Sequence, residues 1–187
     1  MLNHFVSELG EVAHSELAWV FNSSLIVGGA LVTVYMLGLA LCLHGWFRWV
    51  FGIAGLVTGV SGALVGCFPM DDLGPHFRVA MTYFNGGMAT AVLFSIYVLF
   101  FPQTMFPKWL ALPGGVTALC FFSLLYLTEP MMPEGEPLEM VRVMLAQRPP
   151  VWQTAIIEWA VILSVLVWVL TVSVYLWLKA RRNETQK

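Results

Sequence analysis

The sequence predicts an all-α integral membrane protein, a polytopic bundle of five transmembrane helices. Hydrophobic residues make up 59% of the 187 positions and charged residues only 11%, whereas soluble domains contain about 25% charged residues. Several uninterrupted apolar segments are long enough to cross a bilayer, which takes about 20 residues in a helix. Because lipid offers no hydrogen-bond partner to a bare backbone, we expect each of these segments to be helical.

The five predicted spans follow one another with short connections. They cover residues 19–43, 46–68, 76–101, 109–128 and 152–178.

The remaining segments are interpreted from their charge. Residues 1–18 contain no Lys or Arg and are interrupted by Glu8 and Glu11, so we interpret them as an outer surface segment and not as a signal peptide. Residues 19–178 then form a single transmembrane domain, and residues 179–187 form a basic cytoplasmic tail. In the last outer loop, apolar residues recur at helical spacing between Leu138 and Arg148, which predicts a short amphipathic helix.

The basic residues predict the orientation. They cluster in the segments that follow the first, third and fifth spans, namely Arg48, Lys108, Lys179, Arg181, Arg182 and Lys187. Cytoplasmic loops carry an excess of Lys and Arg, so we expect the N-terminus outside and the C-terminus inside the cytoplasmic membrane. The opposite side is acidic, and we therefore expect no nucleic-acid partner.

Glycines form a seam along the second predicted span. Their spacing of three and four residues puts them on one helix face, and they are Gly52, Gly55, Gly59, Gly62 and Gly66. Small residues at such positions let two transmembrane helices approach closely. We favour packing within the chain, and the alternative is association of two copies.

Several short motifs resemble a known family. They are Ser7-Glu8-Leu9-Gly10, Trp19-Val20-Phe21-Asn22, Gly28-Gly29, and Gly66-Cys67-Phe68-Pro69 followed by Asp71, Asp72 and His76. In their order and spacing the chain resembles domain of unknown function 998, a group of uncharacterised prokaryotic multi-pass membrane proteins. The resemblance implies a six-helix architecture with a helix ahead of Ser7, which we expect this chain to lack. It implies no activity.

Candidate site residues lie between the second and third spans. Asp71, Asp72 and His76 combine two carboxylates with an imidazole. Pro75 suits the first turn of a helix, which puts His76 near the positive end of the helix dipole, where a neutral ring is favoured. Further along, a polar stripe descends into the third span, and we expect it to face other helices; it consists of Arg78, Thr82 and Asn85.

Glu158 is the ionisable residue deepest in a predicted span. With a rise of about 1.5 Å per residue it lies roughly 8 Å below Gln153, so it should be paired or protonated. Arg78 is at comparable depth and is the expected partner. Asn22 opens the first span at the same level, and together these residues predict an outward-facing polar pocket.

Four functions fit these residues. We favour a non-catalytic role: binding a lipid headgroup or small amphiphile, with Arg78 facing an anionic group, or stabilising a membrane partner or a second copy. This role needs no cofactor. An alternative is a membrane hydrolase in which Asp71, Asp72 and His76 hold a divalent metal. A further alternative is proton-coupled transport through Glu158, and the weakest is a copper site built from methionines, namely Met70, Met131 and Met132.

Overall fold

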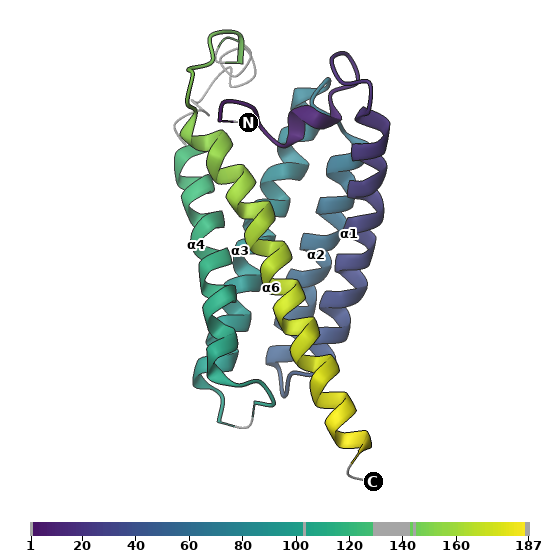
Figure 1. Cartoon of the computed structure of the whole chain (residues 1–187), viewed down its shortest axis with the longest axis vertical. Coiled ribbons are helices and arrows are strands. Elements are labelled where there is room, and N and C mark those ends of the chain that lie inside the picture. Colours follow the sequence, from purple (N-terminus) through teal and green to yellow (C-terminus); the bar gives the residue numbers. More distant parts are fainter. Residues whose placement is uncertain (1, 103, 129–142, 144, 186–187) are drawn as a thin grey trace.

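The computed structural model describes residues 2–102, 104–128, 143 and 145–185 (Figure 1). The described residues form five long helices and two short 3-10 helices. These are η1 (Ser7–Gly10), α1 (Ala18–Leu41), α2 (Phe47–Cys67), α3 (Leu73–Phe100), η2 (Lys108–Leu110), α4 (Ala111–Thr128) and α6 (Gln153–Glu184). The five long helices, with η2 counted as part of the α4 span, are long and apolar enough to cross a membrane. The prediction of an all-α bundle with five such helices is therefore confirmed.

The last helix departs most from its predicted span. It continues to Glu184, past the predicted end at residue 178. Apolar composition is needed only inside the bilayer, whereas helical hydrogen bonding continues into the basic segment. There the guanidinium of Arg181 lies 4.4 Å from the ring centroid of Trp177. The amphipathic helix predicted between Leu138 and Arg148 falls largely outside the described residues.

Successive helices run up and down the bundle and pack against their neighbours in chain order, from α1 to α2, α3, α4 and α6 (Figure 1). We call the end that holds the N-terminus and the α2–α3 link the N-face, and the opposite end the C-face. α6 runs obliquely across the bundle, from beside α4 at the N-face towards the ends of the other helices at the C-face (Figure 1).

The main hydrophobic core lies in the C-face half. Aromatic side chains from all parts of the bundle meet there, including Phe47, Phe51, Phe94, Tyr97, Phe106 and Trp168. The backbones of α1 and α6, by contrast, make few close approaches to each other along the described chain. The oblique course of α6 therefore leaves space inside the N-face half of the bundle.

The helices α1 and α2 make the tightest backbone contact. A Cβ added at Gly59 would lie only 2.6 Å from the backbone nitrogen of Thr33, and one added at Gly55 would lie 2.6 Å from Cβ of Met36. Real Cβ atoms essentially never come this close to another heavy atom. Gly55 and Gly59 of α2 thus pack against α1 of the same chain.

The segment ahead of α1 covers the N-face. We call residues 2–17 the N-terminal strap. Near its start, the carbonyl of Leu2 accepts a hydrogen bond of 2.8 Å from the N–H of Trp152, just before α6. Near its end, the N–H groups of Val12 and Ala13 donate to the carboxylate of Asp71 in the α2–α3 link. The strap therefore ties the beginning of α6 to the far side of the bundle.

Candidate functional site

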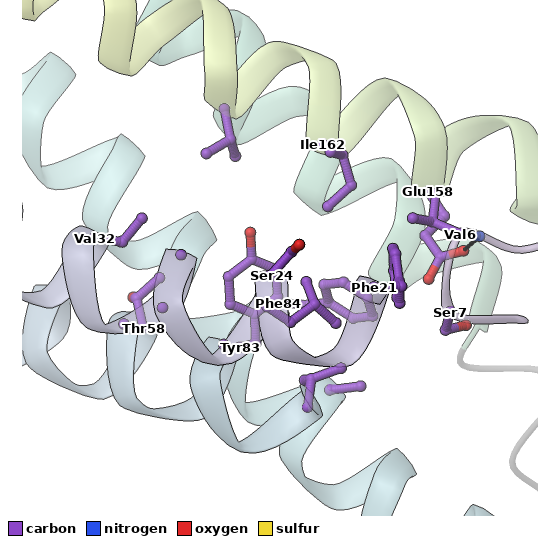
Figure 2. Close-up of a pocket in the computed structure, with 18 of the residues that line it drawn as sticks. Val6, Ser7, Phe21, Ser24, Val32, Thr58, Tyr83, Phe84, Glu158 and Ile162 are labelled. Atoms are coloured by element: carbon purple, nitrogen blue, oxygen red, sulfur yellow. Dashed lines mark hydrogen bonds between the residues drawn. The ribbon is translucent and has the colours of Figure 1, made fainter. Parts of the chain in front are cut away.

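The space between α1, α2, α3 and α6 is a cavity of about 190 Å³. We call it the main cavity. Its walls are mostly apolar side chains and glycines, among them Phe21, Leu25, Gly28, Val32, Gly62, Phe84, Ile162 and Leu166. Figure 2 shows Glu158, Val6 and Ser7 at one end of this space and Val32 and Thr58 at the other. The cavity is thus an apolar chamber with its charged group at the end nearest the strap.

Glu158 closes the N-face end of the main cavity. Its side chain is buried, with 8% of the residue exposed. Its Oε2 atom accepts a hydrogen bond of 2.6 Å from the N–H of Val6 in the strap (Figure 2). Among the described residues, no Lys or Arg forms an ion pair with this carboxyl. The strap supplies hydrogen bonds to Glu158, but it supplies no positive charge.

His76 lies in the second turn of α3 and also lines the main cavity. Its Nδ1 atom is 2.7 Å from the carbonyl oxygen of Phe68. A carbonyl oxygen can only accept, so Nδ1 carries the proton and donates. In the neutral ring this leaves Nε2 as an acceptor.

Hydroxyl groups add a few polar points to the apolar wall. Ser24 and Thr58 line the cavity, but each donates its hydroxyl to the carbonyl one turn earlier in its own helix, at Val20 and Ala54 respectively. Tyr83 stands in the cavity with its hydroxyl directed into the open space (Figure 2). These groups offer weak polar contacts and no charge.

A second cavity of about 80 Å³ adjoins the first under the strap. It lies between α3, α4 and the beginning of α6, and residues outside the main cavity that line it include Phe5, Met70, Leu73, Phe77, Leu124 and Trp152. Five residues line both cavities: Ser7, His76, Ala80, Phe84 and Glu158. We call these five the shared wall.

Of the eight site residues predicted from the sequence, only Glu158 and His76 line the main cavity. Asn22 lies just above it, where its Nδ2 donates to the carbonyl of Gly10 at 2.9 Å. Asp71 is exposed and accepts from two N–H groups of the strap, at 2.8 and 3.0 Å. Asp72 is exposed at the start of α3 and makes no side-chain cap hydrogen bond.

The expectation that the polar stripe of α3 faces other helices is wrong. Arg78, Thr82 and Asn85 are all exposed on the surface of the bundle. Thr82 and Asn85 need no partner from another helix, because each donates to the carbonyl four residues earlier, at 2.8 Å. The expected ion pair between Arg78 and Glu158 is also absent, since the N–H of Val6 takes that place.

The proposed metal ligands are not gathered at one point. The carboxylate of Asp71 is engaged by the strap, and His76 points Nδ1 at a carbonyl oxygen. No group of three His, Cys, Asp or Glu side chains that could hold a metal ion occurs within the described residues.

The strap also has its own charged anchor at Glu8. The carboxylate accepts a hydrogen bond of 2.8 Å from Arg148 and one of 3.0 Å from the N–H of Phe5, and it lies 2.7 Å from Nδ1 of His4. Burial raises the pKa of Glu8, but these hydrogen bonds outweigh it and hold the pKa below its ordinary value of 4.5. The charged form of Glu8 is therefore part of what fastens the strap.

Asp71 fastens the other end of the strap in the same way. Slight burial raises its pKa, but the hydrogen bonds from the N–H groups of Val12 and Ala13 outweigh that effect. The pKa of Asp71 consequently stays below its ordinary value of 3.8.

Comparison with known families gives one match. The family described as "Protein of unknown function (DUF998)" matches residues 1–175. The chain belongs to the DUF998 family. This confirms the resemblance inferred from the short motifs. Comparison with the curated proteins and with the solved structures finds no match.

Two of the motifs that suggested DUF998 come together at the N-face. The segment Ser7–Gly10 is η1, the turn of the strap that lies over Glu158. A Cβ added at Gly10 would collide with the side chain of Asn22 and come within 3.1 Å of Phe21. The first two motifs therefore pack against each other, and they form the roof of the main cavity.

Sequence reasoning missed most of this chamber. Ser7 and Tyr83 line it, and the strap covers it, yet none of them stood out as a site residue. The signal for Ser7 was present in the first motif. Tyr83 carried no signal, because an aromatic residue in a transmembrane helix is ordinarily part of the packing.

Proposed function

We propose that this protein binds a small amphiphile taken from the bilayer, with the apolar part in the main cavity and the polar end beside Glu158. One observation carries the proposal: an apolar cavity of about 190 Å³ ends at a buried carboxyl group. Apolar cavities stay dry and take up apolar ligands. A buried carboxyl group fixes the orientation of a ligand with one polar end.

The size of the cavity limits the ligand. An engineered apolar cavity of about 150 Å³ holds one benzene molecule. A chamber of about 190 Å³ therefore suits a single ring or a short alkyl chain. A longer tail would extend out between helices.

The geometry supports entry from the membrane. The strap covers the N-face, whereas the backbones of α1 and α6, which both line the cavity, make few close approaches to each other. A ligand that enters between these two helices never has to leave an apolar environment except at its polar end. This favours amphiphiles already dissolved in the bilayer over ligands from the aqueous phase.

The orientation is part of the proposal. Five described basic residues lie at the C-face: Arg48 at the start of α2, Lys108 in η2, and Lys179, Arg181 and Arg182 near the end of α6. By the positive-inside rule this face is cytoplasmic, so the strap and the carboxyl group lie in the outer half of a prokaryotic cytoplasmic membrane.

Filling the cavity tests the proposal. Gly28 lines the main cavity, and a Cβ added there would meet no atom within 4 Å. Gly28→Leu should therefore fold normally and occupy ligand space. The matched control is Gly38→Leu on the same helix, where an added Cβ also meets nothing within 4 Å and the residue lines neither described cavity.

Binding is measured by equilibrium dialysis of labelled octanol, octanoate and octylamine against the protein in lipid nanodiscs, with empty discs subtracted. At least one compound should bind the native protein. Gly28→Leu should weaken the affinity for that compound at least about tenfold. Two methylene groups excluded from the cavity cost about 0.8 kcal/mol each, and about 1.4 kcal/mol corresponds to a tenfold change in affinity. Gly38→Leu should bind as the native protein does. If no compound binds, or if both variants bind equally, the proposal is refuted.

A further inference from the structure

The shared wall separates the two described cavities and carries polar as well as apolar side chains. Its members include Ser7, His76 and Glu158, and the remaining two, Ala80 and Phe84, are apolar. A ligand with its tail in the main cavity would bring its polar end to this wall, with about 80 Å³ of the second cavity beyond it.

The Glu158 carboxylate and the His76 ring offer hydrogen-bond acceptors at this wall. The carboxylate of Glu158 has two oxygen atoms that accept, and Oε2 accepts from the N–H of Val6. His76 donates Nδ1–H to Phe68, so Nε2 of its neutral ring accepts. A ligand that meets this wall must therefore bring hydrogen-bond donors.

The charges around the two cavities also favour a cationic ligand. No Lys or Arg lines either cavity among the described residues. Glu158 is buried and has no cationic partner in that part of the chain. A buried charge is stable only when it is paired or neutralised. An anionic headgroup at this wall would meet a second negative charge with nothing to offset it.

Building on the proposed function, we propose that the polar end of the amphiphile is a primary amine in its ammonium form. The ammonium group has three donors and no acceptor, which matches the carboxylate of Glu158 and Nε2 of His76. The ammonium group also supplies a cationic partner for the Glu158 carboxylate. The Arg78 side chain plays no part in this recognition, because it lies on the exposed surface of α3. The site therefore selects alkylamines over alcohols and against carboxylates.

The three octyl compounds separate this inference from the function on which it rests. They share one tail and differ only in the polar end. The native protein in zwitterionic nanodiscs should bind octylamine at least about tenfold more tightly than octanol, since hydrogen bonds to charged groups are the stronger ones. Octanoate should bind most weakly. This comparison needs no variant and holds even if a substitution were to disturb folding.

Glu158→Gln tests the residue itself. The substitution removes the charged contact, so it should reduce octylamine affinity at least about tenfold more than octanol affinity and abolish the preference for the amine. The matched control is Glu184→Gln, at the exposed end of the same helix, which should keep the preference for the amine.

The possible results divide cleanly. If octanol or octanoate binds as tightly as octylamine and Gly28→Leu weakens that binding, the amine inference is wrong while the proposed function stands. An amine preference that survives Glu158→Gln also overturns the inference. If none of the three compounds shows binding that depends on Gly28, the proposed function itself fails.

Discussion

Replacing Glu8 with Gln should loosen the strap at its α6 end. The Glu8 carboxylate holds three groups at once: Arg148 ahead of α6 at 2.8 Å, the N–H of Phe5 at 3.0 Å, and Nδ1 of His4 at 2.7 Å. Only 13% of its side chain is exposed. Val6, two residues before Glu8, donates the hydrogen bond to Glu158, so a looser strap should expose that N–H.

The size of the effect follows from the contact. Hydrogen bonds to charged groups contribute about 1.5–3 kcal/mol. The Arg148 side chain is 29% exposed and is partly screened by water, so we take the lower end. Gln can still accept from the N–H of Phe5, and the main loss is the charged contact. A loss of about 1.4 kcal/mol in the free energy of strap opening corresponds to about a tenfold change in the open population.

Hydrogen exchange of residues 2–17, measured by mass spectrometry in nanodiscs, reports that population. Exchange in the Glu8→Gln protein should be about tenfold faster around Val6. The matched control is Glu11→Gln, because the Glu11 carboxylate lies on the same strap and contacts His14, three residues away, at 3.1 Å. Unchanged exchange at Val6, or equal acceleration by both variants, would show that Glu8 does not anchor the strap.

The pH dependence of hydrogen exchange at Val6 gives a second test of the Glu8 contacts. The pKa of Glu8 is lowered in the folded protein, so its contribution is complete above the ordinary value of 4.5 and is lost as the pH falls through the lowered value. Native exchange at Val6 should therefore accelerate in acid. In Glu8→Gln this acid step should be smaller.

Two further predictions concern the scaffold. Gly59→Ala should lower the melting temperature, because its Cβ would lie 2.6 Å from the Thr33 nitrogen, whereas Gly115→Ala, with nothing within 4 Å, should not; equal melting temperatures would contradict the tight α1–α2 contact. The second prediction concerns Asp71, whose pKa is lowered in the folded protein. The carboxylate of Asp71 therefore stabilises the strap fully above its ordinary pKa of 3.8, and this stabilisation is lost as the pH falls through the lowered value. Asp71→Asn should speed hydrogen exchange at Val12 and Ala13 above that pH and remove the acceleration that acid causes in the native protein. Exchange there that is identical in native and variant protein would refute the role of Asp71.

The helices could be predicted from the sequence because one physical requirement decides them. About 20 apolar residues are needed to cross a bilayer, and this fixed four of the spans to within a few residues of α1, α2, α3 and α4. The end of α6 was missed because a helix continues into polar sequence when its backbone hydrogen bonds are still satisfied.

The site could be predicted only in part. Glu158 was found because an ionisable residue inside an apolar span is costly and therefore stands out, and His76 was found because it follows two carboxylates between two spans. The pairing of Glu158 with Arg78 was wrong because depth in the membrane says nothing about which side of a helix a residue occupies. The strap was missed as a component of the site because its contact joins Val6 to Glu158 across 152 positions, and no local periodicity reports such a contact.

The most direct test of the central claim is the position of a bound amphiphile. A structure of the protein in complex with a bromine-labelled octylamine would locate the tail by the anomalous signal of bromine. The account predicts bromine inside the main cavity, between Gly28 of α1 and Ile162 of α6, with the amine next to Glu158. Bromine found only on the outer surface of the bundle, with the cavity empty, would contradict it.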